Sequence, residues 1–136
     1  IIRALEIEKF SNTLPQKGSD INNFIVIGFT TSREKLYERI NKRVDEMVEN
    51  GLIDEVRALF EKGLSEDSQS MKGIGYKELF PYFRSESSLE ECLNLIKQHS
   101  RNFAKRQMTW FRSMPYIKWF ENNQIEEIKN YIRGKL

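Results

Sequence analysis

Basic and aromatic side chains share the nine residues AKRQMTWFR at positions 104–112. Lysine and arginine bind phosphate groups, and aromatic rings can stack on nucleic-acid bases. The segment lies within residues 92–120, which contain no aspartate or glutamate. The same stretch contains six basic residues: Lys97, Arg101, Lys105, Arg106, Arg112 and Lys118. Such an excess of positive charge is typical of a surface that binds a polyanion, although a solvated helix face has the same appearance.

A helical projection separates the side chains of this region into two faces. At ~100° per residue, Lys97, Arg101, Lys105 and Arg112 fall within roughly 80° and form a basic ridge, while Arg106 lies apart from it near His99. An apolar arc contains Cys92, Leu93, Ile96, His99, Phe103, Ala104, Trp110 and Phe111. By this spacing we expect Trp110 and Phe111 in the core rather than stacked on bases, and His99 buried and hydrogen-bonded rather than catalytic.

Arg43 is a second candidate for binding an anion. In a helix it projects near Leu36 and Met47, at the margin of an apolar stripe, with Arg39 one turn earlier. A charged group in that position either extends to solvent or has an anionic partner. A guanidinium group matches the geometry of phosphate oxygens, so both readings stay open.

The glycines of SMKGIGYK, residues 70–77, form the third candidate. Gly73 and Gly75 let the backbone approach a ligand closely, or allow a tight turn into the next helix. A single G-x-G is an unspecific signal. The G-x-x-x-x-G-K-[ST] motif of a P-loop does not occur in the 136 residues.

Composition excludes several classes of site. The net charge is only +2, and there is one cysteine, Cys92, and one histidine, His99. An internal disulfide and a cysteine- or histidine-rich metal site are therefore excluded. No apolar run approaches the ~20 residues of a membrane span, and we find no signal peptide. We expect an intracellular, cytoplasmic protein.

The elements that position these residues are mostly helical. Residues 24–30 (FIVIGFT) form an apolar run typical of a strand buried on both faces, and 116–120 (YIKWF) form a weaker strand candidate. The first expected helix runs from a cap at Thr31 or Ser32 to about Asn50, and the second covers 52–63. A short helix is expected at 76–83, where Pro81 limits any continuation. Ser88 caps a long helix at 89–112, and the last helix covers 124–133.

Two short strands cannot form a sheet that buries residues 24–30. We therefore expect the missing strands upstream and interpret the chain as a portion of a longer protein. In this organisation, residues 1–10 end an upstream helix, 11–23 form a loop, 24–30 form a sheet strand, and 31–136 form a C-terminal helical region.

The segments at 33–63, 70–82, 104–112 and 117–120, in this order and spacing, closely resemble the C-terminal portion of bacterial tRNA dimethylallyltransferases, also called tRNA isopentenyltransferases. Residues 1–7 are similar to the segment just before it. The resemblance implies the C-terminal part of an ATP-binding-type P-loop α/β domain with added helices. It implies transfer of a dimethylallyl group from its pyrophosphate to the exocyclic amine of an adenine beside the tRNA anticodon.

The resemblance also implies roles for individual residues. Arg43 matches an arginine that contacts the pyrophosphate. The tRNA-contacting positions are Arg3, Lys72, Gly73, Ile74, Gly75, Tyr76, Lys77, Lys105, Arg106, Gln107, Met108, Thr109, Trp110, Phe111 and Arg112. At 72 and 77, lysine replaces the arginine of relatives, which keeps the charge but loses the bidentate fork. The nucleotide-binding P-loop, the aspartate that acts as general base and the Mg²⁺ ligands are implied upstream.

These observations leave three hypotheses for function. The first is the tRNA prenyltransferase, with the anticodon stem-loop and dimethylallyl pyrophosphate as partners, and with 136 residues that are inactive alone. The second is a non-catalytic helical RNA-binding module. The third is a helical protein–protein interaction domain whose basic ridge is only solvated surface. Binding to RNA that depends on salt distinguishes the first two from the third. We expect a monomer.

Overall fold

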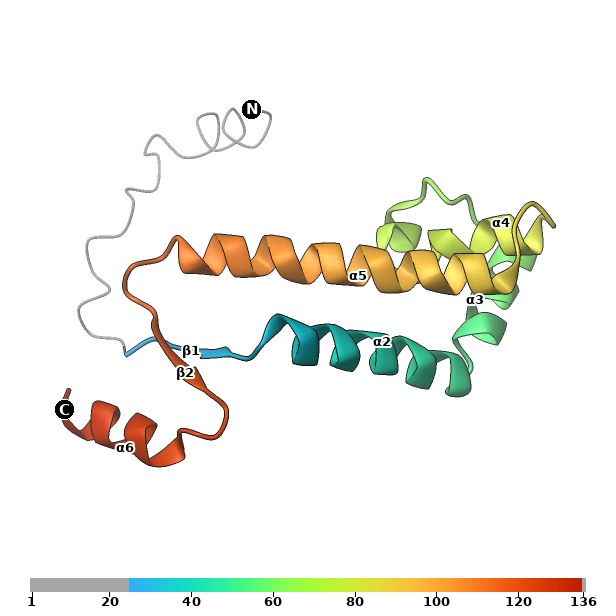
Figure 1. Cartoon of the computed structure of the whole chain (residues 1–136). Coiled ribbons are helices and arrows are strands. Elements are labelled where there is room, and N and C mark those ends of the chain that lie inside the picture. Colours follow the sequence, from blue (N-terminus) through green and yellow to red (C-terminus); the bar gives the residue numbers. More distant parts are fainter. Residues whose placement is uncertain (1–24, 136) are drawn as a thin grey trace, which may run out of the picture.

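Two long helices dominate the computed structural model, which describes residues 25–135. α2 and α5 run antiparallel side by side, with α3 and α4 at one end and the strands with α6 at the other (Figure 1). The elements are β1 (Ile27–Thr30), α2 (Arg33–Glu49), α3 (Leu52–Glu61), η2 (Gln69–Lys72), η3 (Lys77–Leu79), α4 (Phe80–Phe83), α5 (Leu89–Arg112), β2 (Lys118–Glu121) and α6 (Ile125–Arg133). The expected helical architecture with two strands is confirmed. The expectations for residues 1–10 and 11–23, including Arg3, lie outside the described residues.

The ends of the long helices follow from local side-chain chemistry. The Ser32 hydroxyl accepts a hydrogen bond from the Lys35 amide at the start of α2. Ser88 and Glu91 form a reciprocal capping box at the start of α5, so the expected bounds 89–112 are confirmed. Gly51 separates α2 from α3 with a φ of 95°, a left-handed conformation that favours glycine. None of the helices between residues 25 and 135 is long and apolar enough to cross a membrane.

The role expected for Pro81 is wrong. Instead of limiting the helix around residues 76–83, Pro81 lies in the first turn of α4. The first turn of a helix does not use its backbone N–H groups internally, so proline is tolerated there. The short helix instead ends after Phe83, and Ser85 has a φ of 60°.

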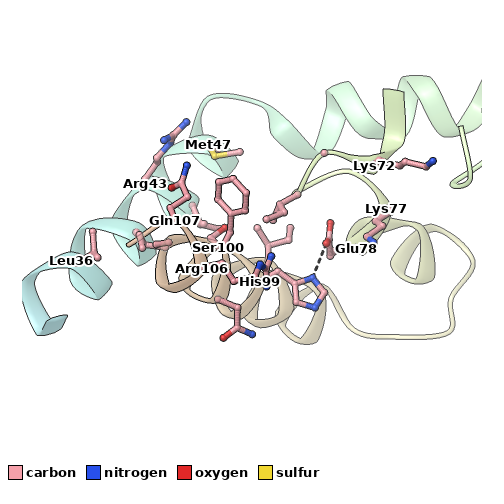
Figure 2. Close-up of a pocket in the computed structure, with 18 residues that line it drawn as sticks. Leu36, Arg43, Met47, Lys72, Lys77, Glu78, His99, Ser100, Arg106 and Gln107 are labelled. Atoms are coloured by element: carbon pink, nitrogen blue, oxygen red, sulfur yellow. Dashed lines mark hydrogen bonds and ion pairs between the residues drawn. The ribbon is translucent and has the colours of Figure 1, made fainter. Parts of the chain in front are cut away.

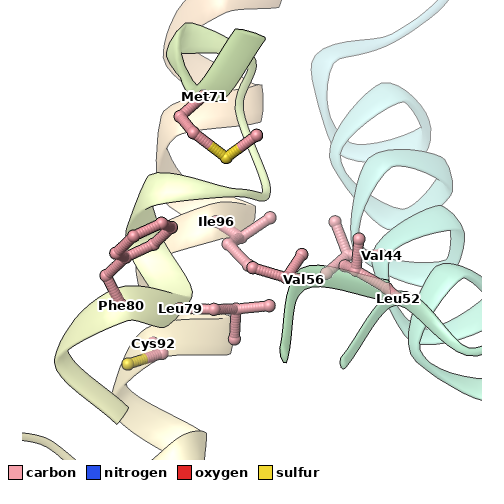
Figure 3. Close-up of a cluster of buried hydrophobic side chains, with 8 residues drawn as sticks. All are labelled: Val44, Leu52, Val56, Met71, Leu79, Phe80, Cys92 and Ile96. Atoms are coloured by element: carbon pink, nitrogen blue, oxygen red, sulfur yellow. The ribbon is translucent and has the colours of Figure 1, made fainter. Parts of the chain in front are cut away.

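The core lies where α2, α3, α4 and α5 meet. The buried residues of this cluster are Val44, Leu52, Val56, Met71, Leu79, Phe80, Cys92 and Ile96 (Figure 3). Val56 and Leu79 are fully enclosed, and the ring of Phe60 packs edge-on against that of Phe80. Met71 belongs to the glycine-containing stretch 70–77, so this cluster anchors the start of that stretch to the core between the two long helices.

β1 and β2 form a parallel pair at the opposite end of the long helices. Gly28 pairs with Trp119, and a Cβ atom on Gly28 would lie 2.6 Å from the Trp119 ring. The expected bounds 24–30 and 116–120 are shifted, because the ladder covers only Ile27–Thr30 and Lys118–Glu121. Phe29 is 60% exposed in the described chain, and burial of residues 24–30 by strands outside these residues stays a prediction.

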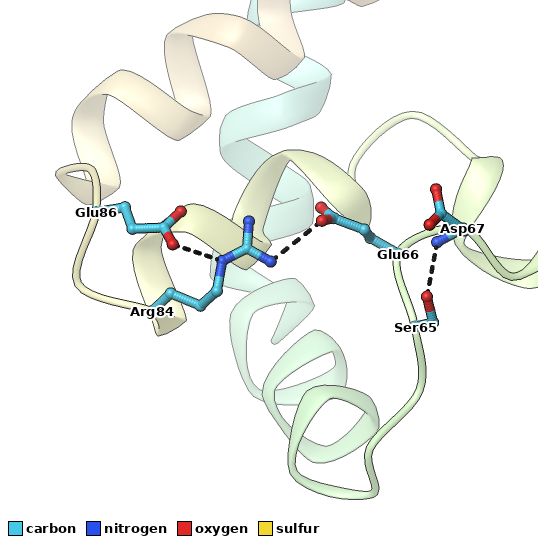
Figure 4. Close-up of polar contacts among 5 residues, drawn as sticks. All are labelled: Ser65, Glu66, Asp67, Arg84 and Glu86. Atoms are coloured by element: carbon cyan, nitrogen blue, oxygen red, sulfur yellow. Dashed lines mark hydrogen bonds and ion pairs between the residues drawn. The ribbon is translucent and has the colours of Figure 1, made fainter.

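Arg84 forms an ion pair with Glu66, which lies in the loop that follows α3. Its guanidinium group contacts Glu86 and Glu66 at 3.0 and 3.2 Å, and the Ser65 hydroxyl accepts a hydrogen bond from the Asp67 amide (Figure 4). The two carboxylates raise the pKa of Arg84 by hydrogen bonding. This bridge ties the loop at Glu66 to the end of α4, next to the start of the 70–77 segment.

Candidate functional site

A cleft of about 1080 Å³ opens between α2, residues 72–78 and α5. Its cationic side chains come from all three segments: Arg43 from α2, Lys72 and Lys77 from the glycine-containing stretch, and Arg106 from α5 (Figure 2). Leu36, Met47 and Phe103 supply apolar wall. The structure therefore brings three of the sequence candidates to one cavity, although more than 60 residues separate Arg43 from Arg106 in the chain.

Arg43 lies at the edge of the α2–α5 contact, as its position on the helix predicts. Val44, its neighbour, is buried in the core, while the Arg43 side chain is exposed and lines the cleft beside Met47. It makes no ion pair with another described residue. A guanidinium group held beside apolar wall without a carboxylate is suited to bind a phosphate or pyrophosphate group.

The 70–77 segment presents its lysines to the cleft because the rest of it is anchored. Gly75 is buried with a φ of 112°, and Ile74 packs against the core. Lys72, Gly73, Ile74 and Lys77 line the cleft. Tyr76 faces another way, since its hydroxyl donates a 2.7 Å hydrogen bond to Glu55 of α3. That hydrogen bond, together with burial, raises the pKa of Tyr76.

Glu78 is the buried charged residue that ties this segment to α5. The residue is 3% exposed, and one carboxylate oxygen accepts a 2.9 Å hydrogen bond from the Gly75 amide. The other oxygen lies 2.8 Å from Nδ1 of His99 (Figure 2). His99 has its hydrogen-bond partner as expected, but its side chain is 38% exposed and lines the cleft instead of being buried. The Glu78–His99 contact therefore joins the 72–78 segment to α5, and these are two walls of the cleft.

The segment 105–112 divides its side chains among three hollows, because a helix presents successive residues in different directions. Arg106 and Gln107 line the cleft already described. Lys105, Met108, Thr109 and Arg112 line a second cleft of about 420 Å³ against the start of α2. Lys105, Arg106, Thr109 and Trp110 line a third hollow between them. Phe111 packs edge-on against Trp110, with ring centroids 4.8 Å apart.

The structure corrects two features of the helical projection. Trp110 is 60% exposed and is not core, and Phe111 and Phe103 are also exposed, because no described element covers the last turns of α5 on that side. The basic ridge is not continuous. Lys97 forms an ion pair with Asp45, and Arg101 donates a 2.7 Å hydrogen bond to Asn41, so both bind α2 and only Lys105 and Arg112 stay exposed.

Glu78 and Arg33 were not predicted as site residues. A glutamate that follows the G-x-G pair by three residues and precedes the apolar Leu79 and Phe80 is a weak signal for a buried partner. Arg33 and Arg39 line the second cleft opposite Lys105 and Arg112. Arg39 lies four residues before Arg43, on the same helix face, and that spacing is the signal that links it to the site.

Comparisons with known proteins show which family this chain is similar to. Residues 1–114 match the family model described as IPP transferase. A tRNA dimethylallyltransferase of Limosilactobacillus reuteri is 50% identical over 145 residues, which cover 100% of this chain and 46% of the relative. One of Geobacillus kaustophilus is 44% identical over 151 residues, with 100% and 47% covered.

Two solved structures share the fold. The full-length tRNA isopentenylpyrophosphate transferase from Bacillus halodurans has a TM-score of 0.75 and 46% identity, and the match covers 98% of this chain and 44% of that one. A tRNA isopentenylpyrophosphate transferase from Staphylococcus epidermidis has a TM-score of 0.72 and 37% identity, with 100% and 43% covered. The chain therefore spans about half the length of the relatives that it matches.

Proposed function

Because the chain belongs to the IPP transferase family, we propose that, at the full length of its relatives, it transfers a dimethylallyl group from dimethylallyl pyrophosphate to the exocyclic amine of the adenine beside the tRNA anticodon. The observation that carries the proposal is the shared cleft, in which Arg43, the lysines of residues 72–77 and Arg106 face one cavity. The curated relatives named above are tRNA dimethylallyltransferases, which supports the same reaction.

The proposed reaction forms a carbon–nitrogen bond and breaks a carbon–oxygen bond. The adenine amine attacks the allylic carbon, the bond from that carbon to the pyrophosphate oxygen breaks, and the pyrophosphate leaves with the electron pair. The amine then loses a proton to a general base, which we propose to lie outside this chain. Negative charge grows on the leaving oxygen, and a preorganised guanidinium group stabilises it. We assign this contribution to Arg43.

The RNA must also be held with the target base out of its stack, because the amine is otherwise inaccessible. Lys72, Lys77 and Arg106 are placed around the cleft to bind backbone phosphates, which positions the RNA without reading its sequence. The cleft volume of about 1080 Å³ is at the upper end of ordinary ligand pockets and leaves room for a nucleobase. Phe103 offers an apolar surface against which a base can lie.

Further parts of the proposal rest on the family resemblance. Mg²⁺, a P-loop of the ATP-binding type and a monomeric state remain proposals, and no cluster of metal-binding side chains occurs between residues 25 and 135. The Mg²⁺ would help to neutralise the pyrophosphate, and its ligands are proposed outside this chain. An anticodon stem-loop substrate implies a cytoplasmic enzyme. Light scattering by the full-length enzyme tests the proposal that it is a monomer.

The test of the function uses the full-length enzyme, meaning a protein of the relatives' length that contains this chain. We expect Arg43→Ala to lower kcat/KM by roughly 100-fold or more, as for loss of one preorganised charge donor. The far-UV circular dichroism spectrum should stay near that of the wild type, since Arg43 makes no ion pair with another described residue. The affinity for anticodon stem-loop RNA should also change little, because Arg43 is assigned to the pyrophosphate and not to the RNA. Near-normal kinetics would make Arg43 a structural residue.

The same assay separates the enzyme from the alternative of a non-catalytic RNA-binding module. That module would bind the stem-loop with a strong salt dependence but would transfer no prenyl group at any enzyme concentration. We also expect the 136 residues alone to bind pyrophosphate weakly and to show no turnover. Measurable prenyl transfer by the 136 residues would contradict the assignment of the base to a segment outside them.

A further inference from the structure

Four cationic side chains face one another across the second cleft. Arg33 and Arg39 reach it from α2, and Lys105 and Arg112 reach it from the last two turns of α5. Its volume is about 420 Å³. Thr30 and Asn122, at the carboxyl ends of the parallel strands β1 and β2, also line it. In open α/β sheets, ligands bind outside this edge of the strands.

The positive charges of this cleft have no counter-charge in the described part of the chain. None of the residues that line it is acidic, and none of its four cations forms an ion pair with another described residue. Some other cations of the described chain do form ion pairs, as Lys97 does with Asp45 and Arg84 does with Glu66 and Glu86. Like charges that converge without partners repel one another, and a bound anion relieves that repulsion.

A third hollow shares lining residues with both the second cleft and the first cleft. This hollow has a volume of about 540 Å³ and is lined by Lys105, Arg106 and Trp110. It shares Lys105 with the second cleft and Arg106 with the first. Positive charge therefore follows a line from the first cleft along α5 to the ends of the strands, with an exposed indole ring beside it. An extended polyanion with bases fits this line better than a single diphosphate does.

We propose that Arg33 and Arg39 extend the RNA-binding surface by binding backbone phosphates of the tRNA beyond the first cleft. We call Arg33, Arg39, Lys105, Arg106 and Arg112 the basic track. The inference rests on the proposed function, because it takes the RNA to be the tRNA held in the first cleft. Arg33 is preorganised for this contact, since its Nε donates a 3.0 Å hydrogen bond to the Tyr37 hydroxyl and its guanidinium carbon lies 5.1 Å from the centre of that ring.

The experiment measures anticodon stem-loop affinity of the full-length enzyme between 50 and 200 mM salt. Each phosphate contact contributes a fixed slope to the salt dependence. Removing one contact should therefore lower the ratio of Kd at 200 mM to Kd at 50 mM by about threefold. We expect this change for Arg33→Ala and for Arg39→Ala, and the wild-type slope for Arg39→Lys, which keeps the charge. Arg57→Ala is the matched control, since Arg57 is an exposed arginine of α3 outside all three hollows.

Two further measurements distinguish a failure of this inference from a failure of the proposed function. Lys105→Ala tests the RNA segment that the family resemblance assigns. If Lys105→Ala changes the slope but Arg33→Ala and Arg39→Ala match Arg57→Ala, the inference is overturned and the proposed function stands. A wild-type enzyme that does not bind the stem-loop overturns both. Inorganic pyrophosphate is the second probe: if the two arginine variants lose pyrophosphate binding but keep the RNA slope, the cleft holds a diphosphate and the inference is overturned.

Discussion

Replacing Glu78 with alanine should release the segment that carries Lys72 and Lys77 from α5. The change leaves the buried Gly75 amide without its acceptor, which costs about 1–3 kcal/mol. The deleted methylene of a buried side chain adds about 0.8 kcal/mol. His99 is partly exposed, so water replaces the partner that it loses. We therefore expect local opening to become easier by about 2–4 kcal/mol.

Glu78→Gln is the matched variant for this prediction. The glutamine carbonyl can accept the Gly75 hydrogen bond, and its amide can donate to Nδ1 of a neutral His99. Hydrogen bonds between neutral groups are weaker than charge-assisted ones by about 1 kcal/mol, so the variant should lose less than alanine does. The expected order of protection is wild type, then Glu78→Gln, then Glu78→Ala.

Hydrogen–deuterium exchange of the peptide around residues 71–79 in the full-length enzyme measures this opening. A change of 2–4 kcal/mol corresponds to roughly 30- to 900-fold faster exchange. The affinity for stem-loop RNA should fall together with the protection, because Lys72 and Lys77 lose their fixed positions. Wild-type exchange rates in Glu78→Ala would refute the argument that this carboxylate holds the segment. Equal acceleration in peptides from α2 and α5 would refute the local character of the effect.

Three further predictions address single residues. Trp110→Ala should change the free energy of unfolding, measured by denaturant titration, by less than about 1 kcal/mol, because the ring is 60% exposed. The same variant should weaken stem-loop binding, measured by RNA titration, if a base stacks on the ring. Gly28→Ala should cost about 1–3 kcal/mol and lower Tm, because its Cβ would lie 2.6 Å from the Trp119 ring. Hydrogen bonds from Ser88 lower the pKa of Glu91, so its stabilising contribution is present above the unfolded pKa and lost as pH falls through the folded pKa; Glu91→Gln should reduce the stability difference between pH 7 and pH 3.

The local signals of the sequence were sufficient for the two long helices. Ser88 with Glu91 starts α5, and Met114-Pro115 follows its end, so the bounds of this helix could be predicted from capping chemistry. The faces of the same helix could be predicted only in part. Helical periodicity says that Ile96 and Trp110 share an apolar arc, but not how far a packing partner extends along it. η3 and α4 pack against α5 away from Trp110, which stays exposed.

The site depends on contacts between segments that are distant in sequence, and this limits what the sequence alone can predict. Arg43 could be singled out because a charge at the margin of an apolar stripe is unusual on its own helix. Glu78 could not, because its role requires His99 from another helix and the φ of Gly75. Arg101 and Lys105 are four residues apart on one face, yet Arg101 binds Asn41 and Lys105 faces the second cleft. A pattern of charge therefore predicts where cations lie, and only the packing of α2 against α5 decides which of them remain available to bind an anion.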